Sequence, residues 1–419
     1  MRPCPGSLSP TQVVPARPFK LSSMGKRVDY RDFFLLDEEL DFEYKAIRDT
    51  VREFVENEVK PIINDYWEKG EFPVHLIPRI AELGLIGSYF PEEYGGAGLD
   101  KLAYGLITRE LEAGDSGIRS FVSVQTSLVM YPIYAFGSEE QKKKYLPKLA
   151  SGEIIGAFGL TEPDAGSDPS SMQTRAYRKG NEWILRGTKM WITNANLSHI
   201  AIIWAKDEEG VIRGFIVERD MGYETQKMKG KGSLRASDTG EIILDDVVVP
   251  DENRLPKAEG LKYPLMCLTH ARYGIAWGAV GIGISLLEEA TEYAKERIMF
   301  GSPIARFQIT QEKLADMLTW IQNANLVVYR LAYLDKIGKM THHHVSYAKR
   351  YAVRAAKMVA EKARGMMGAN GIMLEYNAIR HMANLEAVET YEGTYEIHTL
   401  ILGELITGMD AFRVGDGKK

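Results

Sequence analysis

The sequence predicts a mainly α protein with a β domain in its middle. Apolar residues recur at helical spacing up to about residue 152 and again after about residue 256. Between these stretches, short runs of β-branched and aromatic residues alternate with turn signals, which is typical of strands. The 419 residues are enough for three such units. We therefore predict domains over 29–152, 153–255 and 256–419, the middle one a small antiparallel barrel or sandwich.

Apolar stripes define the helices of the first domain. The first apolar stripe consists of Ile47, Val51, Phe54, Val55, Val59 and Ile62. Charged residues lie between these positions. Further helices are expected over 75–86, 102–112, 122–136 and 139–149. Glycine-rich turns such as 94–98 separate them, so this domain is predicted to be all-α.

The period changes at about residue 153, where the strands begin. Strands are expected over 154–160, 183–185, 200–205, 214–217 and 241–249, with turns such as 179–181 between them. After Pro250 and Pro256 the helical pattern returns. Long helices are predicted near 264–298, 307–338, 345–368 and 394–407.

Composition excludes several classes of protein. The net charge of −5 gives no sign of a nucleic-acid footprint. Two cysteines, Cys4 and Cys267, cannot build a disulfide framework and suit a reducing compartment. The most apolar run, 273–287, is shorter than the roughly 20 residues that a membrane span needs.

The first 28 residues are predicted to form a disordered extension. They contain basic but no acidic side chains, a bias that resembles a mitochondrial transit peptide. Prolines at positions 3, 5, 10, 15 and 18 would prevent the amphipathic helix of such a peptide. We therefore expect a cytoplasmic protein, with Met24 as a possible start and the mitochondrial matrix as the alternative location.

Two patterns that resemble ligand sites are better explained by structure. Gly278, Gly281 and Gly283 have the wrong spacing for a dinucleotide loop and lie within a helical pattern, so close helix packing is expected. The adjacent histidines over 342–344 do not converge on one helical face, and no metal site is predicted.

A stretch near the C-terminus carries the clearest chemistry. Gly393 can end one element and Thr394 can cap the next helix, which places Glu392 at a turn. A carboxylate there is a candidate general base if its site excludes water. The alternative is a solvated turn residue.

Two segments of the middle domain together suggest a cofactor site. The segment 158–168 leaves a strand and enters a loop of hydroxyls and flexible backbone. Trp191, Ile192 and Thr193 sit at a strand end and offer an aromatic face and a hydroxyl. Such groups could hold a flat heteroaromatic cofactor. Taken separately, they would be an ordinary turn and a core tryptophan.

Several motifs in fixed order identify a family resemblance. They are Leu160-Thr161-Glu162-Pro163 with Gly166-Ser167-Asp168, Trp191-Ile192-Thr193, Arg297 before Phe300-Gly301, Gln308, and Tyr391-Glu392-Gly393-Thr394. On these motifs the chain resembles the acyl-CoA dehydrogenases over about residues 35–415. The resemblance implies FAD as cofactor, an N-terminal helical domain, a middle β domain and a C-terminal four-helix bundle.

Further motifs are similar to the glutaryl-CoA dehydrogenase branch of that family. They cover 115–120, 167–172, 271–278, 371–372, 380–381 and 384–388. This branch implies that Glu392, between Tyr391 and Gly393 of the substrate site, is the catalytic base. It implies that Arg119 and Ser120 hold the distal carboxylate of the substrate, with Glu112 near Arg119. Ser167 and Arg272 would contact the thioester portion of CoA.

The resemblance also implies the flavin contacts and the reaction. The FAD contacts would be Phe158, Leu160, Thr161, Trp191, Thr193, Arg297, Gln308, Met367, Gly368, Thr394 and Phe412. The implied reaction converts glutaryl-CoA to crotonyl-CoA and CO₂. Electrons would pass to electron-transfer flavoprotein, and the protein would be a homotetramer without nucleic-acid or membrane partners.

Departures from the family pattern keep alternatives open. Ile118 stands where an aromatic residue is common, Gly368-Ala369 replaces a Gly-Gly pair, and Tyr395-Glu396 replaces a His-Asp pair. The alternatives are a short-chain acyl-CoA dehydrogenase or oxidase, a glutaryl-CoA dehydrogenase that does not decarboxylate, and a catalytically silent flavin-binding protein. A bidentate cation at Arg119 suits a dicarboxylic acyl tail, but it could instead form a structural ion pair with Glu112 or Asp115.

Overall fold

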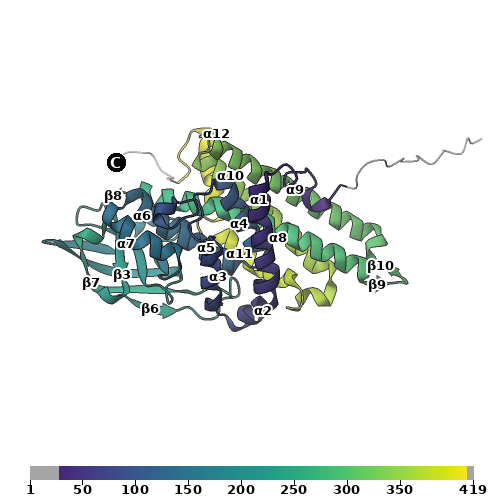
Figure 1. Ribbon diagram of the computed structural model, residues 1–419, viewed down its shortest axis with the longest axis horizontal. Helices are drawn as coiled ribbons and strands as arrows, with labels where there is room; N and C mark the ends of the chain where they lie inside the picture. The colour runs from purple at the N-terminus through teal and green to yellow at the C-terminus, as the bar shows by residue number, and fades with distance from the viewer. Residues whose placement is uncertain (1–27, 413–419) are drawn as a thin grey trace, which may run out of the picture.

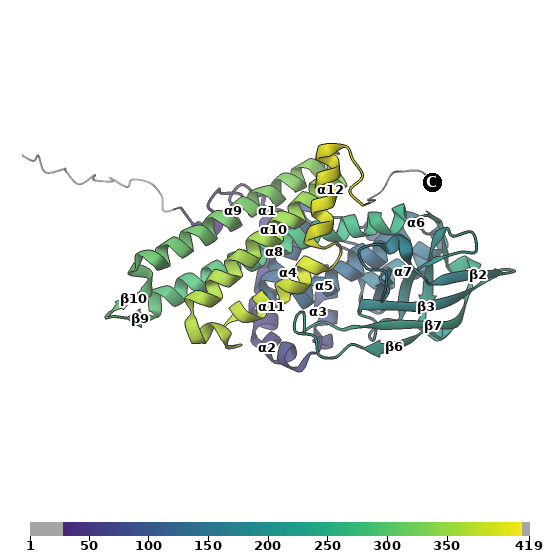
Figure 2. The same ribbon diagram turned by 180° about the vertical axis from the view of Figure 1, so that it is seen from behind.

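The computed structural model describes residues 28–412 of the chain (Figure 1). The predicted N-terminal extension lies outside this range except for its last residue, so its disorder and the cytoplasmic location stay predictions. The β-sheet lies at one end of the molecule. The long helices α8 (Lys262–Glu296), α9 (Gln308–Lys336) and α10 (His342–Met366) extend toward the other end, as both views show (Figures 1 and 2).

The N-terminal domain is all-α, as predicted. Its helices are α1 (Phe42–Phe54), α2 (Lys60–Lys69), α3 (Ile77–Glu82), α4 (Lys101–Gly114), α5 (Ser116–Ser123), α6 (Tyr131–Phe136) and α7 (Glu139–Ala150). Two π-helical segments, Val55–Val59 and Val124–Met130, join α1 to α2 and α5 to α6. Side chains cap several of these helices. The side chains of Asp100, Asp115 and Ser138 accept hydrogen bonds from the backbone N–H groups of Ala103, Gly117 and Gln141, respectively.

The middle domain is one eight-stranded sheet in the order β6-β7-β3-β2-β4-β5-β8, with β1 beside β4. Its strands are β1 (Gly156–Gly159), β2 (Arg175–Lys179), β3 (Glu182–Thr193), β4 (Ile200–Lys206), β5 (Ile212–Glu218), β6 (Glu224–Lys227), β7 (Thr239–Pro250) and β8 (Arg254–Glu259).

Two details of this domain differ from the sequence prediction. The sheet is mixed rather than purely antiparallel, because β1 pairs with β4 in parallel and β2 meets β4 in parallel at Arg175 and Lys206. A parallel pair requires a crossover connection, which strand patterns do not reveal. Strand β8 also runs past the predicted boundary at residue 255. An edge strand tolerates Pro256 because the missing N–H faces away from the ladder.

The C-terminal domain adds α11 (Asn377–Thr390) and α12 (Tyr395–Thr407) to the three long helices. Helix α11 was not predicted. Its buried face carries the polar Arg380, His381 and Asn384 beside the apolar Ala378, Leu385 and Val388, so its apolar stripe is interrupted. Figure 2 shows α12 at the end of the bundle nearer the sheet.

The glycines of α8 allow close helix packing, as predicted. An added Cβ would lie 1.7 Å from Oε2 of Glu112 at Gly278, 1.9 Å from the carbonyl oxygen of Arg109 at Gly281 and 2.0 Å from Ile321 at Gly283. No side chain fits at these distances. The glycines therefore let α8 approach α4 and α9, and Gly278 leaves room for the carboxylate of Glu112.

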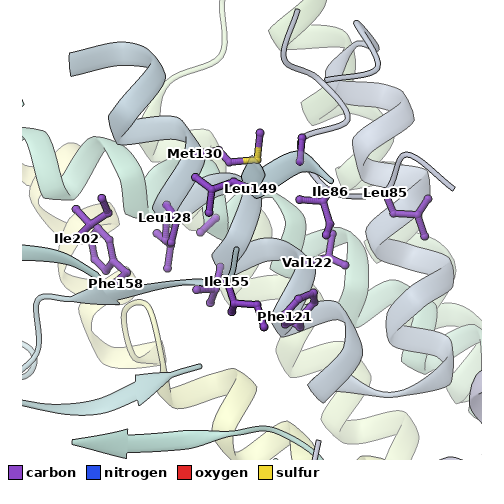
Figure 3. Packing of buried hydrophobic residues seen from close by; sticks show 14 of the residues in the cluster. Leu85, Ile86, Phe121, Val122, Leu128, Met130, Leu149, Ile155, Phe158 and Ile202 are labelled. Atoms are coloured by element: carbon purple, nitrogen blue, oxygen red, sulfur yellow. The ribbon is translucent and has the colours of Figure 1, made fainter. Parts of the chain in front are cut away.

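Apolar packing joins the helical domain to the sheet (Figure 3). Phe158 and Ile202, from β1 and β4, belong to the same buried cluster as Leu128 and Leu149 of the first domain. A second cluster fills the helical bundle, and a third covers the other side of the sheet around Trp183 and Phe215. The first cluster fixes the strand that leads into the 158–168 loop.

A buried polar network connects the three domains. Arg380 donates from Nη1 to Oδ2 of Asp115 at 2.5 Å and to the carbonyl oxygen of Gly114 at 2.9 Å. Asn384 donates to the same Asp115 oxygen and accepts from Nε1 of Trp67 and the backbone N–H of Leu234. These bonds hold α11 against the first domain and the loop before β7.

Within residues 28–412, no helix combines the length and apolarity that crossing a membrane requires.

Candidate active site

The turn between α11 and α12 has the geometry that the sequence predicts. Glu392 has a positive φ of 54° and Gly393 one of 100°. The hydroxyl of Thr394 accepts a hydrogen bond from Ile397 N at 3.2 Å and caps α12. A positive φ at a non-glycine residue is strained and persists only where its surroundings hold it. Here they present the Glu392 side chain at the front of α12.

The carboxylate of Glu392 is not a solvated turn group. Part of the residue is accessible, but its Oε2 is buried and has no hydrogen-bond partner within residues 28–412. Burial raises the pKa of Glu392, while the cations Arg119, Lys349 and Arg272 act against that shift. A carboxylate with a raised pKa and a free buried oxygen is suited to accept a proton near neutral pH.

Arg119 lies beside this turn and is fully buried. It forms a two-point ion pair with Glu112, with Nε–Oε2 and Nη2–Oε1 distances of 2.6 and 3.0 Å. Its Nη2 also donates to the hydroxyl of Tyr391, and its Nη1 has only a 3.4 Å contact with Ser123. Burial acts against the charge, but Glu112 keeps the pKa of Arg119 above its ordinary value. The suggested ion pair with Glu112 exists, whereas Asp115 pairs with Arg380.

Two further cations hold the backbone of the turn. Nε of Arg272 donates to the carbonyl oxygen of Glu392 at 2.6 Å, and burial lowers the pKa of Arg272 to about 10. Nζ of Lys349 donates to the carbonyl oxygens of Tyr391 and Gly393. Lys349 was not predicted as a site residue. Its spacing could have indicated burial, because it lies four residues after Val345 and four before Val353, on the buried face of α10.

The predicted substrate residues are therefore brought together only in part. Glu392, Tyr391, Gly393, Arg119, Glu112 and Arg272 form one connected group. Ser120 is buried on α5 next to Arg119, while Ser167 is exposed in its loop. That loop is shaped by Glu162, which pairs with Nζ of Lys189 at 2.8 Å and accepts from the backbone N–H groups of Gln173 and Thr174.

One group of predicted flavin contacts lies on the sheet. Met190 N donates to the carbonyl oxygen of Thr161 at 2.8 Å, which ties the loop after β1 to the end of β3. Trp191 lies at an irregularity in β3 with a φ of 62° and is 58% exposed, so it is not a core tryptophan. Phe158 and Leu160 are buried beneath the loop, and Thr193 follows on β3. An exposed indole beside a hydroxyl loop fits a flat flavin ring.

A second group of predicted flavin contacts lies at the far end of the bundle. Arg297 and Gln308 are exposed next to the hairpin of β9 (Ile298–Met299) and β10 (Ser302–Pro303). Tyr293 donates to the carbonyl oxygen of Met367 at 3.2 Å, which places Met367 and Gly368 at the same end. Both views show this hairpin at the opposite end of the molecule from the sheet (Figures 1 and 2). Within one chain the two groups do not form a single site.

The remaining predicted flavin contacts lie elsewhere. Thr394 caps α12 two residues after Glu392. Phe412 is 49% exposed at the end of the described chain.

Family models match almost the whole described chain. The acyl-CoA dehydrogenase N-terminal domain matches residues 41–153, the middle domain 157–247 and the C-terminal domain 258–407. The chain belongs to the acyl-CoA dehydrogenase family. It is an FAD-dependent acyl-CoA dehydrogenase.

Individual relatives agree with this assignment. A probable acyl-CoA dehydrogenase of Bacillus subtilis is 39% identical over 373 residues, covering 87% of this chain and 98% of the relative. A short-chain specific acyl-CoA dehydrogenase of Clostridium acetobutylicum is 38% identical over 377 residues, covering 88% and 98%.

Solved structures give the same result. A glutaryl-CoA dehydrogenase from Mycobacterium smegmatis is 50% identical with a TM-score of 0.89, covering 91% of this chain and 99% of the other. A second structure from that organism, in complex with FADH₂, is 46% identical with a TM-score of 0.90, covering 92% and 99%.

Proposed function

We propose that this enzyme is a glutaryl-CoA dehydrogenase that forms crotonyl-CoA and CO₂. The observation that carries the proposal is the position of Arg119, a buried cation beside the Glu392 turn with an under-used Nη1. An apolar acyl tail gives no reason to bury a cation there, whereas a distal carboxylate does. The 50% identity to a glutaryl-CoA dehydrogenase supports the same substrate.

The chemistry assigned to this chain's residues begins with proton transfer. Glu392 accepts a proton from the α-carbon of the acyl-CoA, since burial raises its pKa. FAD, when bound, would supply the acceptor for the hydride of the β-carbon, and Thr161, Trp191 and Arg297 are among the residues that would hold it. Arg272 fixes the backbone of Glu392, so the base stays aligned with the substrate.

Decarboxylation follows from the chemistry of the oxidised product. The bond between the γ-carbon and the distal carboxylate breaks, and CO₂ leaves. The electron pair passes into the unsaturated thioester, and the γ-carbon takes up a proton to give crotonyl-CoA. In this proposal, Arg119 orients the carboxylate through Nη1 while its pair with Glu112 keeps the guanidinium in place.

We further propose that a second copy of the chain completes each FAD site within a homotetramer. One group of predicted flavin contacts lies on the sheet, and the other lies beside the β9–β10 hairpin at the end of the molecule away from the sheet (Figure 1). Exposed apolar side chains surround the remote group, including Phe300 at 93% exposure and Ile309 at 69%. Mixed oligomers of Trp191→Ala and Arg297→Ala chains test this proposal. The mixed oligomers should bind flavin that neither variant binds alone. If they bind no more flavin than the single variants, the proposal that two chains share each FAD site is wrong.

Substrate identity is tested by anaerobic titration with glutaryl-CoA and butyryl-CoA. Glutaryl-CoA should bleach the flavin absorbance at lower concentration, and the products should be crotonyl-CoA and CO₂. A preference for butyryl-CoA would indicate a short-chain acyl-CoA dehydrogenase, which is the second candidate. The observation that favours this candidate is the ion pair with Glu112, which already neutralises the charge of Arg119. Glutaconyl-CoA as the final product would show a dehydrogenase that does not decarboxylate. We propose electron-transfer flavoprotein as acceptor, and peroxide release as the main reoxidation route would instead indicate an oxidase.

The role of the base is tested by Glu392→Gln. The amide cannot accept the proton, so flavin reduction should slow by at least about 1,000-fold, which corresponds to about 4 kcal/mol. Flavin content and substrate binding should be retained. Substantial reduction in this variant would move the base to another residue, with Glu389 and Glu396 as the next candidates.

A further inference from the structure

Three consecutive carbonyl groups of the catalytic turn are bound by two buried cations. Lys349 Nζ donates to the carbonyl oxygen of Tyr391 and, at 2.6 Å, to that of Gly393. Arg272 Nε donates to the carbonyl oxygen of Glu392 between them. The positive φ of Glu392 is strained, and these bonds hold the backbone that adopts it.

Lys349 differs from a lysine buried for structure alone. The chain contains such a lysine at position 189, which is fully buried and pairs with the carboxylate of Glu162 at 2.8 Å. Lys349 is equally buried, yet within residues 28–412 no carboxylate lies at ion-pair distance from its Nζ. An unpaired buried ammonium is costly. Burial lowers the pKa of Lys349 well below its ordinary value, while the anions Glu392 and Glu389 act against that shift. The two carbonyl oxygens and these anions therefore offset the cost of keeping the ammonium charged.

The charged and titratable groups around Glu392 come from six helices. They are Glu112 on α4, Arg119 on α5, Arg272 on α8, Lys349 on α10, Glu389 on α11 and His398 on α12. The buried phenols of Tyr104 on α4 and of Tyr391 in the turn itself also interact with the charge of Glu392. Glu112 pairs with Arg119, and Glu389 pairs with Lys357 at 2.5 Å. Glu392 is therefore the anion left to balance Lys349 and Arg272.

We propose that Lys349 is a positioning residue for the base: it holds the turn through two carbonyl groups and stabilises the ionised, proton-accepting form of Glu392. The proposal rests on the proposed role of Glu392. Lys349 touches the backbone of the turn rather than the reacting atoms, so its effect on the reaction passes through Glu392. Burial alone would leave Glu392 protonated over too wide a pH range, and a fixed nearby cation corrects this.

The experiment compares Lys349→Met, Lys349→Gln and Lys349→Arg. Met removes both the hydrogen bonds and the charge, Gln keeps donor groups without the charge, and Arg keeps the charge. Lys362→Met is the matched control, because it removes a lysine from the same helix whose partner is the surface residue Asp316. Two readouts are followed: the pH dependence of flavin reduction under anaerobic conditions, and amide hydrogen exchange over residues 388–398.

In the Met and Gln variants, the apparent pKa for reduction should rise by about 1–2, slowing reduction about 10- to 100-fold below that pH. Lys349→Arg and Lys362→Met should stay near the wild-type profile. Amide exchange at the turn should accelerate most in Lys349→Met. If that variant does not bind flavin, the Gln and Arg profiles decide the question alone.

The proposal is overturned if the uncharged variants keep the wild-type apparent pKa, or if Lys349→Arg shifts as far as Lys349→Gln. A purely structural lysine would lower flavin content and thermal stability without moving the pH profile. Failure of the underlying assignment looks different, since it appears as retained reduction in Glu392→Gln.

Discussion

Within residues 28–412, two arginine–carboxylate pairs have no solvent exposure at either side chain, and their surroundings differ. Arg380 pairs with Asp115 and uses its other N–H groups on the side-chain oxygens of Asn64 and Asn377 and on the carbonyl oxygen of Gly114. Arg119 pairs with Glu112 through two of its nitrogens, but its Nη1 has only the 3.4 Å contact with Ser123. Both pairs have no solvent exposure.

Burial cannot distinguish a structural arginine from a ligand-binding one here, because both pairs are equally buried. The difference in how their guanidinium nitrogens are bonded can distinguish them. Each of the three guanidinium nitrogens of Arg380 donates to a protein acceptor within 2.9 Å, so this side chain is satisfied in the folded chain and joins structural elements. Under the proposed function, Arg119 gains a close acceptor for its Nη1, which has only a 3.4 Å contact within residues 28–412, when the substrate binds. Arg380 connects the N-terminal and C-terminal domains, whereas we propose that Arg119 binds an anionic group of the substrate.

The largest expected effect comes from breaking the structural pair. Arg380→Met leaves the carboxylate of Asp115 buried without its cation, which should lower the free energy of unfolding by about 3–5 kcal/mol. Urea unfolding measures this loss. The variant Arg380→Met/Asp115→Asn should recover part of it, because the uncompensated charge is gone. Among molecules that remain folded, the ratio of glutaryl-CoA to butyryl-CoA efficiency should be unchanged, and a changed ratio would contradict the division between the two pairs.

The next effect comes from the pair in the active site. Arg119→Met should lower glutaryl-CoA efficiency by about 2–5 kcal/mol, or roughly 30- to several-thousand-fold, while butyryl-CoA loses little. The ratio of the two kcat/KM values cancels general damage to folding or flavin binding. Lys at position 119 should rescue only part of the loss, since an ammonium lacks the planar fork.

The matched control for Arg119 concerns its partner. Arg119→Met leaves Glu112 unpaired, so Arg119→Met/Glu112→Gln removes that complication and should show the same change in ratio. Glu112→Gln alone keeps the cation and should keep the preference for glutaryl-CoA. A ratio within a factor of about two of wild type in the double variant would make Arg119 a structural residue and remove the main support for glutaryl-CoA.

A third cluster of charges, remote from the catalytic turn, predicts a pH dependence of stability. Asp37 accepts from Nη2 of Arg109 at 2.6 Å and from the hydroxyl of Tyr329 at 2.5 Å. Burial opposes its charge, but these partners hold the pKa of Asp37 well below its ordinary value. A depressed folded-state pKa stabilises the protein above the unfolded value of about 3.9, and this stability is lost as the pH falls through the folded-state pKa.

Asp37→Asn tests that sign. The variant should be less stable than wild type by about 2 kcal/mol at pH 7, and the difference should shrink below about pH 4. Urea midpoints at a series of pH values measure it. A difference that grows on acidification would show that the carboxyl is not the group that titrates. Flavin reduction by the folded variant should be unaffected, as for Arg380.

The fold could be predicted from the sequence wherever pattern and burial agree. The helices of α8, α9 and α10 follow apolar periodicity, and the turn at Glu392 follows the chemistry of Gly393 and Thr394. Helix α11 was not predicted, because the polar residues Arg380, His381 and Asn384 interrupt the apolar pattern of its buried face. Strands β2, β6 and β8 were not predicted because they are short and rich in charged or polar residues.

The surroundings of the candidate site residues could not be predicted from the sequence. Motifs pointed to Glu392, Arg119 and Trp191, but contacts between residues hundreds of positions apart decide what surrounds them. Lys349 contributes nothing to a motif, and only the fold brings its ammonium to the carbonyl oxygens of residues 391 and 393. Spacing alone also could not tell whether Glu112 or Asp115 would pair with Arg119, because each follows from how α4, α5 and α11 pack.

The smallest expected effect concerns the hydroxyl groups that cap α12 and α7. Two helices begin with equivalent caps: Thr394 accepts from Ile397 N at 3.2 Å at the start of α12, and Ser138 accepts from Gln141 N at 3.2 Å at the start of α7. Thr394→Ala and Ser138→Ala should each cost about 1 kcal/mol of stability, because both leave a helix N–H without its partner. Only the cap of α12 adjoins the catalytic turn. Thr394→Ala should therefore also slow flavin reduction, by a few-fold, whereas Ser138→Ala should leave it unchanged at equal flavin content. Thr394→Ser restores the hydroxyl and should restore the rate. If the two alanine variants reduce the flavin equally fast, the start of α12 acts only as scaffold, and the strain at Glu392 is held by Lys349 and Arg272 alone.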